Sequence, residues 1–124
     1  EEIFLRDDSL TGEIPKEIAL LTALTGFYIH ENAVEGTIPT EIGLLSDTLQ
    51  VIWLDTNNIT GTIPSQVFLL TNLESFDVFS NQMTGTIPSE IGLLGGFALE
   101  ELSLAENMFS GTVPAELADL DAAL

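Results

Sequence analysis

The side chains that could combine into a catalytic group lie far apart in this sequence. The one histidine, His30, precedes Asp55 by 25 residues and Ser103 by 73. Together these three residues have the composition of a nucleophilic triad. Asp55 and Asp77 also form a pair of carboxylates of the kind that glycoside hydrolysis uses. Either reaction requires a fold that brings these distant residues together.

A second set of residues has the chemistry of ligand binding. Phe4, Tyr28 and Trp53 follow one another at intervals of 24 and 25 residues, and Arg6 and His30 lie two positions after the first two. Aromatic side chains beside charged groups are typical of binding hot spots, and aromatic faces suit sugar rings and cations. The regular spacing indicates that a repeated structural unit positions them.

The composition limits the classes of partner. The 124 residues include 20 Asp and Glu but only 2 Lys and Arg, which gives a formal charge of −18. Such a chain cannot neutralise a run of phosphates, so nucleic acid is excluded and anionic membranes are disfavoured. A hydrophobic content of 45% argues against disorder and predicts a single domain with one modest core. The absence of cysteine and the single histidine exclude thiolate and histidine-rich metal sites, so we expect neither metal nor cofactor.

The repeated unit is 24–26 residues long. In each unit a glycine stands three residues before a proline that follows Ile or Val; the prolines are Pro15, Pro39, Pro64, Pro88 and Pro114. Apolar residues in the order L-x-x-L-x-L precede this motif and predict a strand, and the proline begins a helical or 3-10 turn. The following Ile-Gly-Leu-Leu segment is expected to turn its apolar residues inward. No unit closes a core alone, so the units must stack.

This pattern resembles the plant-type leucine-rich repeat, LxxLxLxxNxLxGxIPxxLGxLxx, over essentially the whole chain. The resemblance implies an α/β repeat fold, a right-handed solenoid with a concave parallel sheet, a short second strand in each repeat and 3-10 or helical convex turns. It covers residues 1–124 as one array of about five repeats. Family members usually carry cysteine-containing caps, and this chain has none, so we expect an array truncated and uncapped at both ends.

Side chains alternate across a strand, so the residues between the apolar positions face the concave solvent. The candidate ligand-binding residues on this face are Phe4, Arg6, Tyr28, His30, Trp53, Asp55, Asp77 and Phe79. The aromatic residues would give apolar contact, Arg6 and His30 would hold an acidic group, and the two aspartates would meet a basic or hydroxylated one. The alternative is that the aromatic side chains only pack against one another and stabilise the sheet.

Catalysis is not predicted. With neighbouring strands about 4.8 Å apart, Ser103 lies roughly 14 Å from His30, beyond hydrogen-bond reach. An open concave face does not exclude water, so we expect no raised pKa at Asp55 or Asp77. The chain is therefore predicted not to be an enzyme.

Two further columns recur once per repeat. A buried Asn side chain both donates and accepts, which favours a structural ladder through Asn32, Asn57, Asn81 and Asn107, with Asp8 in the first unit. Threonines flank the repeated glycines and predict, as an alternative function, an ice-binding or a structural and adhesive surface; they are Thr37, Thr60, Thr62, Thr84, Thr86 and Thr112.

The resemblance implies recognition of a protein or peptide ligand by an extracellular receptor-like or secreted protein, and the acidic group held by Arg6 and His30 could also be that of an acidic saccharide. An extracellular or cell-surface location as part of a longer protein is therefore expected, although the sequence leaves a cytoplasmic one open. Asn58 begins an Asn-Ile-Thr glycosylation sequon. Exposed terminal strands predict end-to-end self-association.

Overall fold

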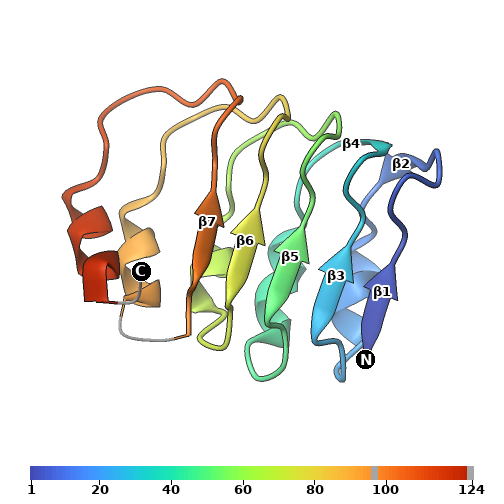
Figure 1. Ribbon diagram of the computed structural model, residues 1–124, viewed down its shortest axis with the longest axis horizontal. Coiled ribbons are helices and arrows are strands. Elements are labelled where there is room, and N and C mark those ends of the chain that lie inside the picture. Colours follow the sequence, from blue (N-terminus) through green and yellow to red (C-terminus); the bar gives the residue numbers. More distant parts are fainter. Residues whose placement is uncertain (96–97, 123–124) are drawn as a thin grey trace.

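The computed structural model describes residues 1–95 and 98–122, with side chains as far as residue 120. The chain forms a solenoid in which each coil contributes one strand to the main sheet and one 3-10 helix, and β1 and η5 lie toward opposite ends (Figure 1). All strands of the main sheet lie on one side of the solenoid and all 3-10 helices on the other. The fold expected from the repeat pattern is therefore confirmed.

The main sheet is parallel and carries the candidate binding residues. Its strands are hydrogen-bonded in the order β1 (Glu2–Phe4), β3 (Gly26–Tyr28), β5 (Val51–Trp53), β6 (Ser75–Asp77) and β7 (Glu101–Ser103). The pairing is in register, so the last residues of the strands form one row across the sheet: Phe4, Tyr28, Trp53, Asp77 and Ser103. We refer to these five residues as the concave row.

The opposite side is a layer of 3-10 helices. They are η1 (Lys16–Leu20), η2 (Thr40–Leu45), η3 (Ser65–Leu69), η4 (Ser89–Leu94) and η5 (Ala115–Ala122). A proline in extended conformation precedes each of the first four, with φ between −65° and −72°. Proline suits this place because its fixed φ is compatible with the turn and a helix start needs no N–H from it.

The expectation that every apolar residue of the Ile-Gly-Leu-Leu segment points inward is wrong. In η2, Ile42 and Leu45 are buried, whereas Leu44 is 74% exposed. A 3-10 helix has three residues per turn, so Ile42 and Leu45 share the inward face, whereas Leu44 is turned outward. The first leucine of the pair therefore faces solvent.

In the part of the chain that the structure describes, the second strand expected in each repeat is present in the first two coils only. There β2 (Thr11–Glu13) pairs with β4 (Ala33–Glu35). In later coils the backbone N–H groups still donate to the preceding coil, as from Thr60 to the carbonyl of Gly36 at 2.7 Å.

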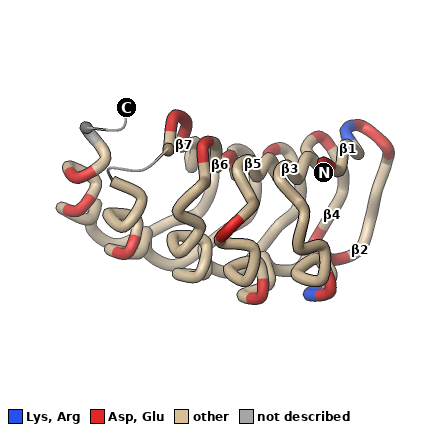
Figure 2. Tube along the Cα trace, turned by 90° about the horizontal axis from the view of Figure 1, so that it is seen from below, with Lys and Arg blue, Asp and Glu red and all other residues tan. Residues whose placement is uncertain are grey.

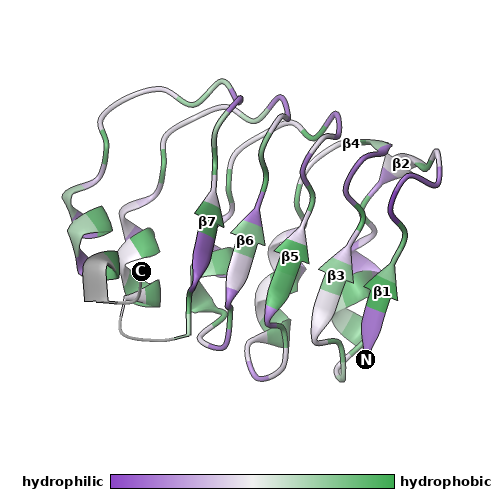
Figure 3. Cartoon of the chain, in the orientation of Figure 1, coloured by the Kyte–Doolittle hydropathy of each residue, from purple (hydrophilic) through white to green (hydrophobic). Residues whose placement is uncertain are grey.

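The core runs along the solenoid between sheet and helices. Ile52, Leu54, Phe76 and Val78 from the sheet side are fully buried, as is Ile91 from the helix side. Hydropathy colouring shows β5 as apolar, whereas β7 begins with a hydrophilic residue (Figure 3). Within the described residues, the chain forms no helix with the length and apolar character that crossing a membrane requires.

Candidate functional site

The first three residues of the concave row form a connected aromatic cluster. The rings of Phe4 and Tyr28 are stacked, with centroids 4.2 Å apart and an interplanar angle of 6°. Tyr28 meets Trp53 edge to face at 5.2 Å, and His30 meets Trp53 in the same manner at 5.5 Å. Parallel pairing in register places these rings on neighbouring strands, where stacked and edge-to-face arrangements are both favourable.

These rings differ in how much surface they offer to a ligand. Tyr28 and His30 are buried, at 9% exposure each, while Phe4 is 61% exposed. Trp53 and Phe79 are half-buried. The cluster therefore supports both interpretations from the sequence, because Tyr28 and His30 pack within the sheet and the other rings keep surface for contact.

A chain of hydrogen bonds fixes the orientation of Trp53. Its indole N–H donates to the hydroxyl of Ser75 at 2.7 Å, and that hydroxyl donates to Glu101 Oε2 at 2.8 Å. Ser75 and Glu101 pair across β6 and β7, one strand further along the sheet. Sequence reasoning did not include these two residues in the site. Val51, Ser75 and Glu101 are the first residues of their strands and pair across the sheet, and this shared position was a usable signal that they lie near Trp53.

Arg6 and His30, the two residues expected to hold an acidic group, both contact other side chains in the structure. Arg6 Nη2 donates to Glu31 Oε1 at 2.8 Å, and this hydrogen bond, with the attraction of that carboxylate, raises the pKa of Arg6. His30 lies against Trp53, and its buried Nδ1 has no hydrogen-bond partner among the described residues. A carboxylate already neutralises the arginine, and packing covers the imidazole.

Two aspartates next to the cluster carry unneutralised negative charge. Burial and repulsion from Asp77 raise the pKa of Asp55, against a smaller lowering by His30. This corrects the expectation that the concave face leaves the pKa of Asp55 unperturbed. Asp77 Oδ1 accepts the backbone N–H of Phe79 at 2.8 Å. Burial also raises the pKa of Tyr28, helped by Glu2 and Glu74.

His30, Asp55 and Ser103, which have the composition of a nucleophilic triad, do not form one in the fold. His30 follows β3 and Ser103 ends β7, with β5 and β6 between them. The ring of His30 packs edge to face against Trp53, and His30 interacts electrostatically with Asp55. Among the described residues, no three His, Asp or Glu side chains are grouped as a metal site would need.

The asparagine column links each coil to its neighbour. Asn57 Oδ1 accepts the N–H of Val34, and its Nδ2 donates to the carbonyls of Ile29, Leu54 and Asp55 at 3.0–3.2 Å. The corresponding side chains, with the same kind of contacts to the preceding coil, are Asn32, Asn81 and Asn107. Asp8 is exposed and contributes only its backbone N–H, to Asn32 Oδ1 at 3.1 Å.

The threonines beside the repeated glycines lie on a third surface. All six are exposed: Thr37, Thr60, Thr62, Thr84, Thr86 and Thr112. Thr60 and Thr84 direct their hydroxyls to the carbonyls of Gly36 and Gly61, at 3.1 and 3.4 Å. Those two glycines both have φ of 77°, which a side chain would strain. In the first coil the column carries Glu13 instead of threonine.

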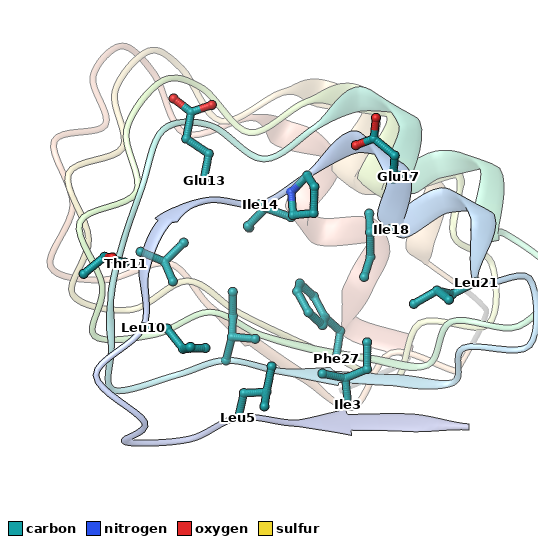
Figure 4. Close-up of a pocket in the computed structure, with 13 residues that line it drawn as sticks. Ile3, Leu5, Leu10, Thr11, Glu13, Ile14, Glu17, Ile18, Leu21 and Phe27 are labelled. Atoms are coloured by element: carbon teal, nitrogen blue, oxygen red, sulfur yellow. The ribbon is translucent and has the colours of Figure 1, made fainter.

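Two further features bear on the predicted glycosylation and self-association. Asn58 is exposed, and its side-chain oxygen accepts Gln82 Nε2 at 3.4 Å. At the N-terminal end the core opens into a cavity of about 390 Å³. Figure 4 shows apolar side chains such as Ile3, Leu5 and Phe27 directed into this opening, with Glu13 near its edge.

A family model described as "Leucine Rich Repeat" matches residues 48–70, 72–94 and 98–120, together more than half of the chain. A comparison with curated proteins found no match.

Three solved structures illustrate the similarity. The plant peptide hormone receptor RGFR1 in complex with RGF2 superimposes with a TM-score of 0.92 at 32% identity, covering 98% of this chain and 19% of that one. The BIR3–SERK2 complex from Arabidopsis thaliana gives 0.85 at 35%, covering 94% and 61%. A plant ice-binding protein gives 0.86 at 29%, covering 94% and 37%. The chain thus spans about a fifth of RGFR1.

Proposed function

Because this chain belongs to the leucine-rich-repeat family, in its plant type, we propose that it recognises a peptide or protein ligand on its concave sheet. Two of the similar structures support this role. RGFR1 is a peptide hormone receptor in complex with RGF2, and BIR3 and SERK2 form a complex with each other. The proposal assigns this chain binding and no catalysis.

The observation that carries the proposal is the fixed orientation of Trp53 within the aromatic cluster. Its indole is hydrogen-bonded through Ser75 to Glu101 and is packed edge to face against Tyr28 and His30. A side chain already held in one orientation loses little conformational entropy when a ligand binds. A half-buried tryptophan in this condition is the kind of anchor found in binding hot spots.

The charges near the aromatic cluster indicate which chemical group of a ligand would lie beside Trp53. We propose that Asp55 and Asp77 meet a basic or hydroxylated group, since both carboxylates lie beside Trp53 and no cation neutralises them in the structure described here. Binding of an acidic group or an acidic saccharide by Arg6 would require this arginine to exchange Glu31 for the ligand. The basic alternative needs no such exchange.

A random displayed peptide library, panned on the immobilised protein, tests the proposal. Peptides selected by the wild-type protein should lose binding to Trp53→Ala by tenfold or more. Ser103→Ala, at the far end of the concave row, serves as the matched control and should retain it. Circular dichroism checks that each variant folds. Selected peptides that bind Trp53→Ala as tightly as the wild type would remove the concave cluster from recognition.

Ice binding is a second candidate function, supported by the exposed threonines and by the similarity to a plant ice-binding protein. Thr37, Thr62 and Thr86 project next to the glycines of the following coils, with their methyl groups about 2.7–2.8 Å from where a Cβ would stand. Ice recrystallisation in the presence of the wild-type protein and of Thr62→Lys separates the candidates. Inhibition by the wild type and loss in the variant would favour ice binding over recognition.

We further propose an extracellular or cell-surface location for the protein. The exposed Asn58 sequon supplies a direct test in a secretory host. A mass increase that glycosidase treatment removes, and that Asn58→Gln lacks, would show that the chain has been glycosylated at this site.

End-to-end self-association is proposed through the open apolar cavity near Ile3 and Leu5. Sedimentation over a range of concentrations, with Leu5→Asp as the variant that should stay monomeric, tests it. A structural or adhesive array would show this association while tolerating Trp53→Ala.

A further inference from the structure

An apolar row runs along the convex side, far from the concave cluster. It consists of one leucine from each of the helices η1 to η4, and we refer to it as the leucine row: Leu20, Leu44, Leu69 and Leu93. Their exposures are 76%, 74%, 51% and 50% in that order. Single exposed leucines are ordinary, but an aligned row of them is an apolar patch of the kind that marks interaction sites.

The fold itself does not require leucine at these positions. For Leu44, Leu69 and Leu93 the residues two before and one after are buried, such as Ile42 and Leu45 on either side of Leu44. In η5 the corresponding position holds Asp119, which is exposed and follows the same spacing from Pro114. A position that accepts aspartate in one coil carries leucine in the four others for a reason other than core packing.

The helices are in contact with one another in chain order, so the row is continuous. The contacts run from η1 to η2, η2 to η3 and η3 to η4. At the strand spacing of about 4.8 Å, four coils give a row at least 14 Å long. A helix of about ten residues has this length at 1.5 Å per residue.

The charge around the row selects the partner. The first turns of three of these helices carry Glu17, Glu41 and Glu90, and the only basic residue on this side is Lys16. Figure 2 shows both basic residues of the chain toward the N-terminal end and acidic ones along the remaining coils. A second copy of the chain would bring acid against acid, and an anionic membrane would be repelled.

We propose that the leucine row docks a basic amphipathic helix of a partner protein. Apolar residues at positions i, i+3 or i+4 and i+7 of that helix would cover the leucines. Its lysines or arginines would lie beside the glutamates of the first turns, which favours the encounter and fixes the orientation. This surface is separate from the concave site and does not rest on peptide recognition there.

The test uses two synthetic helical peptides with one apolar pattern, built from Leu and Lys or from Leu and Glu. Fluorescence anisotropy with labelled peptides should show binding of the Leu–Lys peptide and at least tenfold weaker binding of the Leu–Glu peptide. A scrambled Leu–Lys peptide, equally charged but not amphipathic, should also bind at least tenfold more weakly.

The decisive variant changes the apolar row and leaves the charge untouched. Leu44→Asn combined with Leu69→Asn should weaken the Leu–Lys peptide tenfold or more, because both leucines are exposed and the substitutions spare the core. Trp53→Ala should leave its affinity unchanged. Equal binding to the double variant would reduce the interaction to charge alone and overturn the proposal. So would a dimer of the wild type that this variant abolishes, or binding to zwitterionic vesicles without binding to the peptide.

Discussion

The concave row and the leucine row both place one side chain per coil at a surface, yet they differ in what each side chain contacts. On the concave side, Phe4 stacks on Tyr28, and Trp53 donates through Ser75 to Glu101. On the convex side, Leu44, Leu69 and Leu93 face outward and each is followed by a buried leucine, with glutamates in the first turns of η2 and η4.

This difference follows from the two kinds of backbone. Strands in register set residues of adjacent coils directly opposite each other, so side chains at the concave surface find partners within the sheet. A 3-10 turn divides its residues into inward and outward ones, and the outward ones project away from the molecule. The sheet can therefore hold a preformed contact surface, whereas the leucine row depends on a partner to be covered.

Adjacent leucines in one helix give the largest expected contrast. Leu45→Ala should lower the free energy of unfolding by about 3 kcal/mol, because Leu45 is 2% exposed and its loss leaves a cavity. Leu44→Ala, one residue earlier and 74% exposed, should change it by less than about 0.5 kcal/mol. Urea unfolding of both variants measures the difference. Equal losses would mean that Leu44 packs as the core does.

These two residues also show how far the sequence predicts the structure. The period of two in the strand segments is sufficient to place Phe4, Tyr28 and Trp53 on the concave face and in one row. In the Ile-Gly-Leu-Leu segment, hydrophobicity alone predicts inward residues throughout. Only the three-residue turn, which the composition does not specify, separates Leu44 from Leu45.

The candidate site was predictable in position and less so in chemistry. The repeat spacing places Arg6 and His30 beside the aromatic residues, but it does not show that Arg6 pairs with Glu31 of the next coil. That pairing depends on side-chain rotamers and on the charges of residues after the strand. The buried environment of His30 depends in the same way on the ring of Trp53, which turns toward it.

The hydrogen-bond chain behind Trp53 supplies the next contrast on the concave side. Ser75→Ala should destabilise the protein by about 1–2 kcal/mol, since it leaves the indole N–H and the Glu101 carboxylate without their shared partner. The chain has one tryptophan, so its emission spectrum reports on this indole alone. Emission should shift in Ser75→Ala and stay unchanged in Ser103→Ala, the matched serine in β7. An unshifted spectrum would show that the hydrogen bond to Ser75 does not hold the indole ring in place.

Relieving backbone strain just after the strands should stabilise the protein by a smaller amount. Thr56 has φ of 55°, a left-handed conformation that a β-branched side chain adopts at a cost. Thr56→Asn should raise the free energy of unfolding by about 0.5–1 kcal/mol, because asparagine tolerates this region. Ser80→Asn, at φ of 53° in the following coil, should gain less since serine is not β-branched. Thermal unfolding of the two variants ranks them, and a loss in Thr56→Asn would place the hydroxyl contact to Asp55 above the strain.

The smallest effect concerns the charge of Asp55 beside the aromatic cluster. Burial and the neighbouring Asp77 raise its pKa in the folded protein, so between its unfolded and folded pKa values the native state binds more protons than the unfolded one. Ionisation of Asp55 therefore costs stability as the pH rises through that interval, and the cost persists at neutral pH. Asp55→Asn should raise the melting temperature slightly at pH 7, and the gain should disappear below the ordinary carboxyl range, where Asp55 is protonated in both states.

Glu41→Gln, on the helix side next to the leucine row, serves as the control for a general reduction of the net charge of −18. If both variants gain equally at pH 7 and lose the gain together on acidification, then global repulsion explains the effect. If only Asp55→Asn does so, the concave face holds a locally strained carboxylate, and a basic group of a ligand placed there would relieve it.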